Sequence, residues 1–161
     1  MTDARFEEVP ATHRPLRLKA ESETDLAVIS SLVQDAVGKV AEIHWARNFR
    51  RLVLLLNRFR WEDKPAADRE NRPYERVQSA LTFETVTRVR SAGVDPTDGG
   101  AVYDVLAIAF APAGDDCGGT LTLTLAGEGA LAAEVEALQV TLADVTRPWA
   151  AQATRAPDHG V

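Results

Sequence analysis

The residues most capable of chemistry gather between Asn57 and Arg76, where arginines alternate with aromatic rings and carboxylates. Guanidinium groups make bidentate contacts to anions and stack on aromatic faces, so this combination is typical of binding surfaces. The sequence therefore predicts a site for a ligand or a partner, formed by Asn57, Arg58, Arg60, Trp61, Glu62, Tyr74 and Arg76.

A purely structural role for the same residues is the alternative. On a strand, Arg58 and Arg60 would share one face, while Phe59 and Trp61 would share the other. In this interpretation the two rings close the core of the protein, and the arginines pair with the carboxylates of Glu62, Glu75 and Glu84. The two interpretations differ in whether the arginines face a partner or the chain's own acids.

No catalytic or cofactor motif competes with this cluster. The glycine pairs at 99–100 and 118–119 lie in predicted turns with no following helix, so neither pair fits a phosphate-binding loop. Cys117 has no histidine or second cysteine at metal-ligand spacing. We predict no metal site and no cofactor, and we assign no catalytic residue. The enzymatic alternative is a cryptic acid-base site that folding would assemble from Asp35, His44, Glu62 and Glu75.

Composition and charge limit the partners. The 161-residue chain is 45% hydrophobic and 26% charged, as in a soluble globular domain. No run approaches the roughly 18 apolar residues of a membrane span, so we expect a cytoplasmic protein that does not bind membranes. The net charge is -6, yet residues 47–76 carry nine Arg or Lys against five Asp or Glu. This balance favours a protein partner or an anionic small molecule and argues against general nucleic-acid binding.

One helix is expected ahead of the cluster. Ser22 and Asp25 resemble a capping box, and Gly38 is placed to end the helix. Between them, one stripe of apolar residues at spacings of three and four consists of Leu26, Ile29, Leu32, Val33, Ala36 and Val37. The pattern therefore predicts a long N-terminal helix.

Strand patterns dominate the rest of the chain. Five consecutive aliphatic residues at 52–56 leave no polar face, which predicts a central strand covered on both sides. Charged residues and prolines at 62–73 indicate an exposed loop. Residues 131–145 fit either one helix or a strand at 131–137 followed by a short helix at 138–145, and we favour the strand and helix. The seven expected strands are 15–20, 40–45, 49–59, 75–90 (with a bulge near Thr85), 101–111, 120–126 and 131–137.

These elements predict an α+β fold. A predominantly antiparallel sheet of about seven strands would be rolled, or partly closed like a pleckstrin-homology barrel, with the long N-terminal helix and a short C-terminal helix against it. We expect a single domain at 15–149, with flexible tails at 1–14 and 150–161.

Four segments, in this order, resemble the DUF2948 family of uncharacterised alphaproteobacterial proteins: PLRLKAESETDLAVISSLVQDAV, LLLNRFRWE, YERVQSAL and VTLADVTRPW. The resemblance spans roughly residues 14–149 and implies a bacterial cytoplasmic protein. It supplies no substrate, catalytic residue or cofactor. Because no catalytic motif is present, we predict a non-catalytic binding or interaction domain, with the cryptic acid-base enzyme as the alternative.

Overall fold

A computed structural model describes residues 14–114 and 117–151. Within these residues, eleven strands form one open, mostly antiparallel sheet, accompanied by two short helices, α2 (Glu23–Leu32) and α3 (Lys64–Glu70). The strands are β1 (Arg17–Ala20), β2 (Val37–Lys39), β3 (Ile43–Ala46), β4 (Arg51–Phe59), β5 (Glu75–Phe83), β6 (Val86–Ala92), β7 (Val102–Pro112), β8 (Gly119–Leu125), β9 (Gly129–Val135), β10 (Val140–Asp144) and β11 (Trp149–Ala150).

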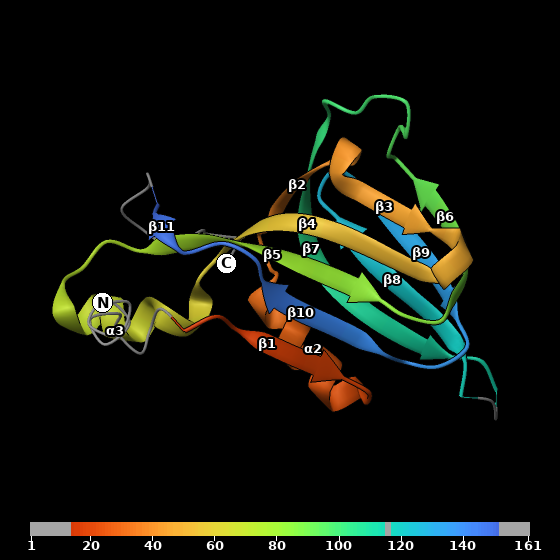
Figure 1. Cartoon of the computed structure of the whole chain (residues 1–161), viewed down its shortest axis with the longest axis horizontal. Coiled ribbons are helices and arrows are strands. Elements are labelled where there is room, and N and C mark those ends of the chain that lie inside the picture. The colour runs from red at the N-terminus through yellow and green to blue at the C-terminus, as the bar shows by residue number, and fades with distance from the viewer. Residues whose placement is uncertain (1–13, 115–116, 152–161) are drawn as a thin grey trace, which may run out of the picture.

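The sheet curves back over itself, so that β4, β5 and β10 lie in front of β7, β8 and β9 (Figure 1). Its order is β1-β10-β5-β4-β2-β7-β8-β9-β6, with β3 beside β4 and β11 beside β5. Alternate residues point inward along each strand because the side-chain period of a strand is two. The inward residues of facing strands form the core, including Leu52, Leu54, Leu56, Leu81, Leu121, Leu123 and Leu142.

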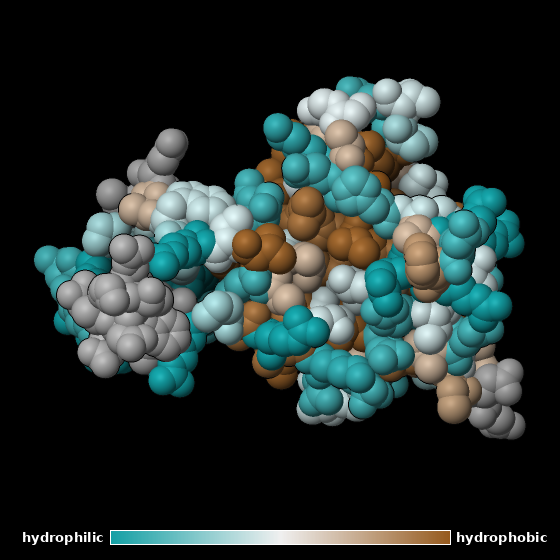
Figure 2. All heavy atoms as spheres, viewed as in Figure 1, coloured by the Kyte–Doolittle hydropathy of each residue, from teal (hydrophilic) through white to brown (hydrophobic). Residues whose placement is uncertain are grey.

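β4 is the predicted central strand, and it lies between β5 on one edge and β2 and β3 on the other. Only one of its faces is fully covered, because Leu54 is buried while Val53 and Leu55 are partly exposed. Apolar residues are visible over the middle of the sheet in Figure 2. The expectation that this strand is covered on both sides is therefore wrong.

The predicted long N-terminal helix is also wrong. Ser22 caps α2 as expected, accepting a hydrogen bond from the backbone N–H of Asp25 at 3.1 Å. The helix ends at Leu32, however, and Asp35 adopts a left-handed backbone conformation with a φ of 69°. The chain then forms β2, which pairs with both β4 and β7 and joins the two halves of the sheet. Strand pairing on both edges of β2 outweighs the helical periodicity of the sequence.

Gly38 permits a close approach between strands and does not end a helix. It lies in β2 opposite Tyr103 of β7. A Cβ atom at this position would lie 2.5 Å from the Tyr103 hydroxyl oxygen and 3.1 Å from a Leu56 methyl carbon. Since real Cβ atoms do not approach other atoms to 2.5 Å, only glycine fits here without a shift of the tyrosine ring.

The short C-terminal helix is wrong as well. The strand predicted at 131–137 is present as β9, but the residues that follow form β10, which lies between β1 and β5. Val140 and Leu142 are buried, while Thr141 lies on the other face of the strand, so these residues follow a period of two. The helical spacing at 138–145 arises because both periods place apolar residues at several of the same positions.

Other expectations need correction. The sheet has eleven strands instead of seven and is open instead of partly closed into a barrel. The predicted loop at 62–73 contains α3, and the long strand at 75–90 is divided at Thr85, whose φ is 54°. Within the described residues, no helix is long and apolar enough to cross a membrane. The tails predicted at 1–14 and 150–161 lie almost wholly outside the described residues.

The contact at Gly38 gives a test of the fold. Gly38→Ala should lower the free energy of unfolding by about 1–3 kcal/mol, because the added methyl group overpacks the space filled by Tyr103. Urea denaturation followed by circular dichroism measures this loss. The matched control is Gly100→Ala, where the nearest atom would lie 3.9 Å from the new methyl group. Equal stability of the two variants would contradict the placement of β2 against β7.

Candidate functional site

The predicted site lies where β4 and β5 extend beyond the rest of the sheet. Residues 60–74 connect the two strands and contain α3; we call them the α3 arm, and Figure 1 shows α3 well away from the body of the sheet. The last residue of β4, Phe59, pairs with Arg76 of β5. Both halves of the predicted site, Asn57 to Glu62 and Tyr74 to Arg76, therefore meet at the base of the α3 arm.

Arg58 points inward, because it continues the inward alternation of Leu54 and Leu56 along β4. Its side chain is fully buried. Nη1 and Nη2 each donate to one carboxylate oxygen of Glu62 at 2.9 Å, and Nε donates to the Ser79 hydroxyl at 2.9 Å. Burial disfavours the charge, but the hydrogen bonds and the negative charge of the carboxylates outweigh it, so the pKa of Arg58 is raised.

Asp144 is the second carboxylate partner of Arg58, and its side chain is only 3% exposed. Its Oδ1 accepts hydrogen bonds from Arg58 Nη2 at 3.0 Å and from the Ser79 hydroxyl at 2.7 Å. Its Oδ2 accepts one from the backbone N–H of Leu16 at 2.9 Å. This one carboxylate therefore ties together β4, β5, β10 and the segment that leads into β1.

Arg60 is also buried, and it holds the α3 arm. Its Nη1 donates to Glu75, and it lies 3.5 Å from an oxygen of the buried Asp63, which in turn receives two 3.1 Å hydrogen bonds from Arg72. Glu62 links the two buried arginines, since its Oε2 lies 3.6 Å from Arg60 Nε. Arg58 and Arg60 thus face Glu62 and Glu75, as the structural interpretation expected.

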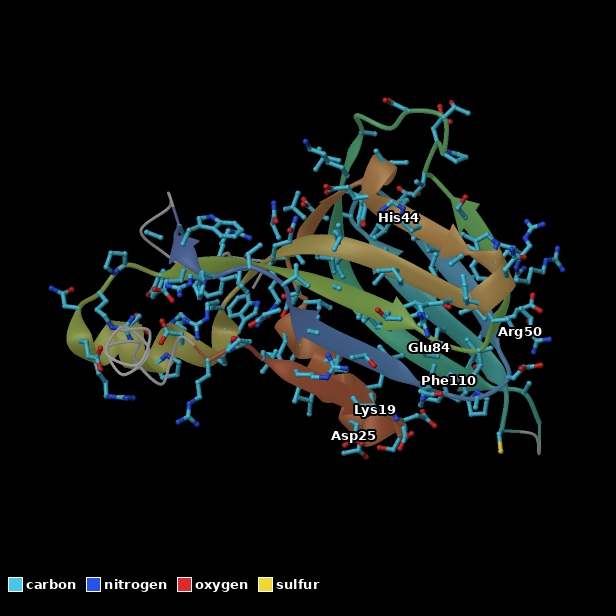
Figure 3. The ribbon with its side chains drawn as sticks, in the orientation of Figure 1. Lys19, Asp25, His44, Arg50, Glu84 and Phe110 are labelled. Carbon is cyan, nitrogen blue, oxygen red and sulfur yellow. The ribbon has the colours of Figure 1, made fainter. Side chains whose placement is uncertain are left out.

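The third expected acid does not join this network. Glu84 instead receives two 3.1 Å hydrogen bonds from Arg51 at the other end of β4. Figure 3 shows Glu84 in this position, far from the α3 arm. The reason is register: Glu84 follows Phe83, which pairs with Leu52 near the start of β4.

The aromatic rings pack against one another at the base of the α3 arm. Phe59 is buried, with its ring centroid 4.7 Å from that of Trp61 and 5.5 Å from that of Tyr74, both in edge-to-face geometry. The indole N–H of Trp61 donates to the backbone oxygen of Gln34 at 3.0 Å. The rings therefore fix the α3 arm to the sheet and to the connection between α2 and β2.

Arg76 and Asn57 are the predicted residues that face outward from the sheet. Arg76 lies between Phe59 on β4 and Trp149 on β11, which is 40% exposed. Its Nη1 is buried and has no hydrogen-bond partner within the described residues. Burial lowers the pKa of Arg76, and the charge of Asp104 opposes the effect. Asn57 is exposed on the same face of β4 as Phe59.

The residues of the enzymatic alternative are only partly assembled. Glu62 and Glu75 meet at Arg60, but His44 pairs with Val53, about 20 Å along β4 from the α3 arm at the rise of a strand. Figure 3 shows His44 on β3, at a distance from that arm. In the described part of the chain, no group of three His, Cys, Asp or Glu side chains could hold a metal ion.

Several residues around the predicted site were missed by sequence reasoning: Asp63, Arg72, Ser79 and Asp144 of the buried network, and Trp149 beside Arg76. One signal was available. Ser79 occupies the same face of β5 as the apolar Val77 and Leu81. Arg58 likewise occupies the same face of β4 as the leucines. A polar residue on an otherwise apolar strand face indicates a buried polar contact. Asp144 carried no such signal, because its segment was predicted to be helical.

The buried network predicts unequal effects of removing carboxylates. Asp144→Ala should lower the free energy of unfolding by about 3 kcal/mol, because it removes one partner of a buried charge. Glu136→Ala is the matched control, since Glu136 accepts a 2.8 Å hydrogen bond from Arg50 in a pair whose side chains are 60% and 55% exposed. That variant should differ little from the parent protein. Similar losses in the two variants, measured by urea denaturation, would argue against a structural role of the buried network.

The chain was compared with known proteins. No curated protein matches it, and no solved structure matches it. A family model described as "Protein of unknown function (DUF2948)" matches residues 16–159, a span that includes the whole candidate site. This match confirms the resemblance seen in the sequence, and the chain therefore belongs to the DUF2948 family.

Proposed function

We propose that the protein is a cytoplasmic, non-catalytic binding domain that holds an anionic group of a protein partner or small molecule at Arg76. One observation carries the proposal: the Nη1 of Arg76 is buried without a hydrogen-bond partner among the described residues. A buried donor left unpaired costs about 1–3 kcal/mol. A carboxylate or phosphate oxygen from a ligand would supply the missing acceptor and recover that free energy.

The surroundings of Arg76 suit such a ligand. Phe59 and Trp149 flank it across the sheet, and the guanidinium group is partly removed from water. Charge-assisted hydrogen bonds are stronger where water is excluded. Trp149 is exposed enough to contact a ligand, and Asn57 adds an exposed amide on the same sheet face. Together these residues offer a cation, an amide and an aromatic surface.

The other predicted residues have a supporting role in this proposal. Arg58, Arg60 and Glu62 are paired with one another or with other residues of the chain, so they are not available to a ligand without breaking those pairs. Trp61 and Tyr74 pack on Phe59, next to Arg76. A rigid base of this kind would lower the entropy cost of binding, because the paired side chains around Arg76 are already ordered.

The test is a titration of the protein with inorganic phosphate and with acetate, followed by NMR of the arginine side chains. The Nε–H signal of Arg76 and the indole signal of Trp149 should shift and reach saturation. In Arg76→Gln, binding should weaken about tenfold or more, because a charge-assisted hydrogen bond is lost. Arg88→Gln removes an exposed arginine on β6 and should leave binding at this site unchanged.

Two results would contradict the proposal. One is the absence of any saturable shift at Arg76 or Trp149 with either anion. The other is equal binding by the parent protein and by Arg76→Gln, which would place the anion elsewhere on the chain.

A further inference from the structure

β6 is the last strand of the sheet, and one of its edges has no strand partner within the described residues. It pairs with β9 from Val86 to Ala92, and no other strand joins it. Figure 1 shows β6 at the margin of the sheet. Most of its residues are exposed. Beyond Val86, whose backbone N–H donates to Arg50, no described strand occupies this edge.

The edge carries positive charge. Val89 packs against the core, so its neighbours Arg88 and Arg90 point away from the core. Arg90 Nε lies 3.7 Å from an oxygen of Glu134, and the Arg90 side chain is 55% exposed. Arg88 makes no ion pair within residues 14–114 and 117–151. Glu134 is also the residue opposite Arg88 on β9, so one carboxylate faces two arginines and the two arginines keep a net positive charge.

The turn between β3 and β4 extends this surface. The backbone N–H of Val86, at the start of β6, donates to the backbone oxygen of Arg50 at 2.8 Å. Next to Arg50, Phe49 is 73% exposed, the highest value among the exposed large hydrophobic residues of the described chain. Figure 3 shows Arg50 at this end of the molecule. An exposed apolar ring therefore lies one residue from the contact between this turn and the start of β6.

We propose that the edge of β6 binds an extended acidic peptide segment of a partner protein, which pairs with β6 as an additional strand. Backbone hydrogen bonds along an exposed edge supply affinity in this mode of recognition, and side chains supply specificity. Carboxylates of the peptide would face Arg88 and Arg90, and an apolar residue at its end would cover Phe49.

Other occupants fit this edge less well. Antiparallel pairing of β6 with a second copy of the chain would place arginines beside arginines, which is unfavourable across strands. A nucleic acid would match the charge but has no alternating N–H and C=O groups to pair with the strand. The surface is also separate from the proposed anion site, because β5 runs from Arg76 to Phe83, about 23 Å, before the chain reaches β6.

The test uses a fluorescent peptide of alternating glutamate and valine with the 7-residue length of β6. Fluorescence anisotropy measures its affinity, and NMR shifts of backbone amides locate it. Saturable binding with shifts at β6 and Phe49 is expected. The Arg88→Glu, Arg90→Glu double variant should weaken binding about tenfold or more, and the double glutamine variant should weaken it less. The matched control, Arg17→Glu with Lys19→Glu on β1, should bind as the parent does.

Two control peptides separate charge from strand pairing. A peptide with lysine in place of glutamate should not bind, and one with a central proline should bind more weakly, because proline cannot donate to a strand ladder. Absence of saturable binding, equal binding of the lysine peptide, or shifts confined to other strands would each overturn the proposal. In those cases the arginines of β6 serve only to prevent edge-to-edge aggregation. The shift map of the parent protein decides the question even if a variant fails to fold.

Discussion

The buried guanidinium of Arg58 is the interaction on which this structure most depends. A charge in the interior is tolerated only when nearby groups neutralise it and satisfy its hydrogen bonds. Arg58 therefore requires Glu62, Ser79 and Asp144 in fixed positions. These residues come from the start of the α3 arm, from β5 and from β10. Satisfying one side chain thus fixes the relative positions of three separate segments.

The same interaction specifies strand register. If β4 shifted by one residue against β5, Asn57 would point inward and Arg58 would face the solvent, away from Ser79 and Asp144. The leucines before Arg58 would leave the core in the same shift. Apolar burial and ion pairing therefore select one alignment, although a buried ion pair by itself contributes little net stability compared with apolar residues. Its main effect here is on specificity.

The residues of the predicted site come together in the fold, but the sequence did not show that they lie on two different faces of the sheet. Alternation along β4 separates Arg58 from Asn57, and Arg76 of β5 lies opposite Phe59, so the predicted cluster contributes to both faces of the sheet. The local pattern was visible in the sequence. The partner of Arg58 was not, because Asp144 is separated from it by 86 positions and was assigned to a helix.

The prediction of the fold was limited in the same way, because it also depended on contacts between residues far apart in the sequence. Strand patterns with clear alternation, such as that of β8, were recognised, whereas Val37 in β2 and Val140 in β10 were assigned to helices. Both segments also fit a helical period, and both are strands because neighbouring strands on each edge pair with them. Such pairing is non-local, and a single sequence contains no record of which strands will be neighbours.

The two proposed binding surfaces, at the α3 arm and at β6, would rely on different physical properties. At the α3 arm, Arg76 is a partly dehydrated cation with an unpaired donor, so affinity would come from one strong, directional contact. At β6, the charges are exposed and individually weak, so affinity would come from many backbone hydrogen bonds along an edge. The acidic total charge of -6 bears on both surfaces, because it repels anionic partners that contact the protein elsewhere. Binding at either proposed surface should weaken as salt screens the attraction between its arginines and an anionic partner.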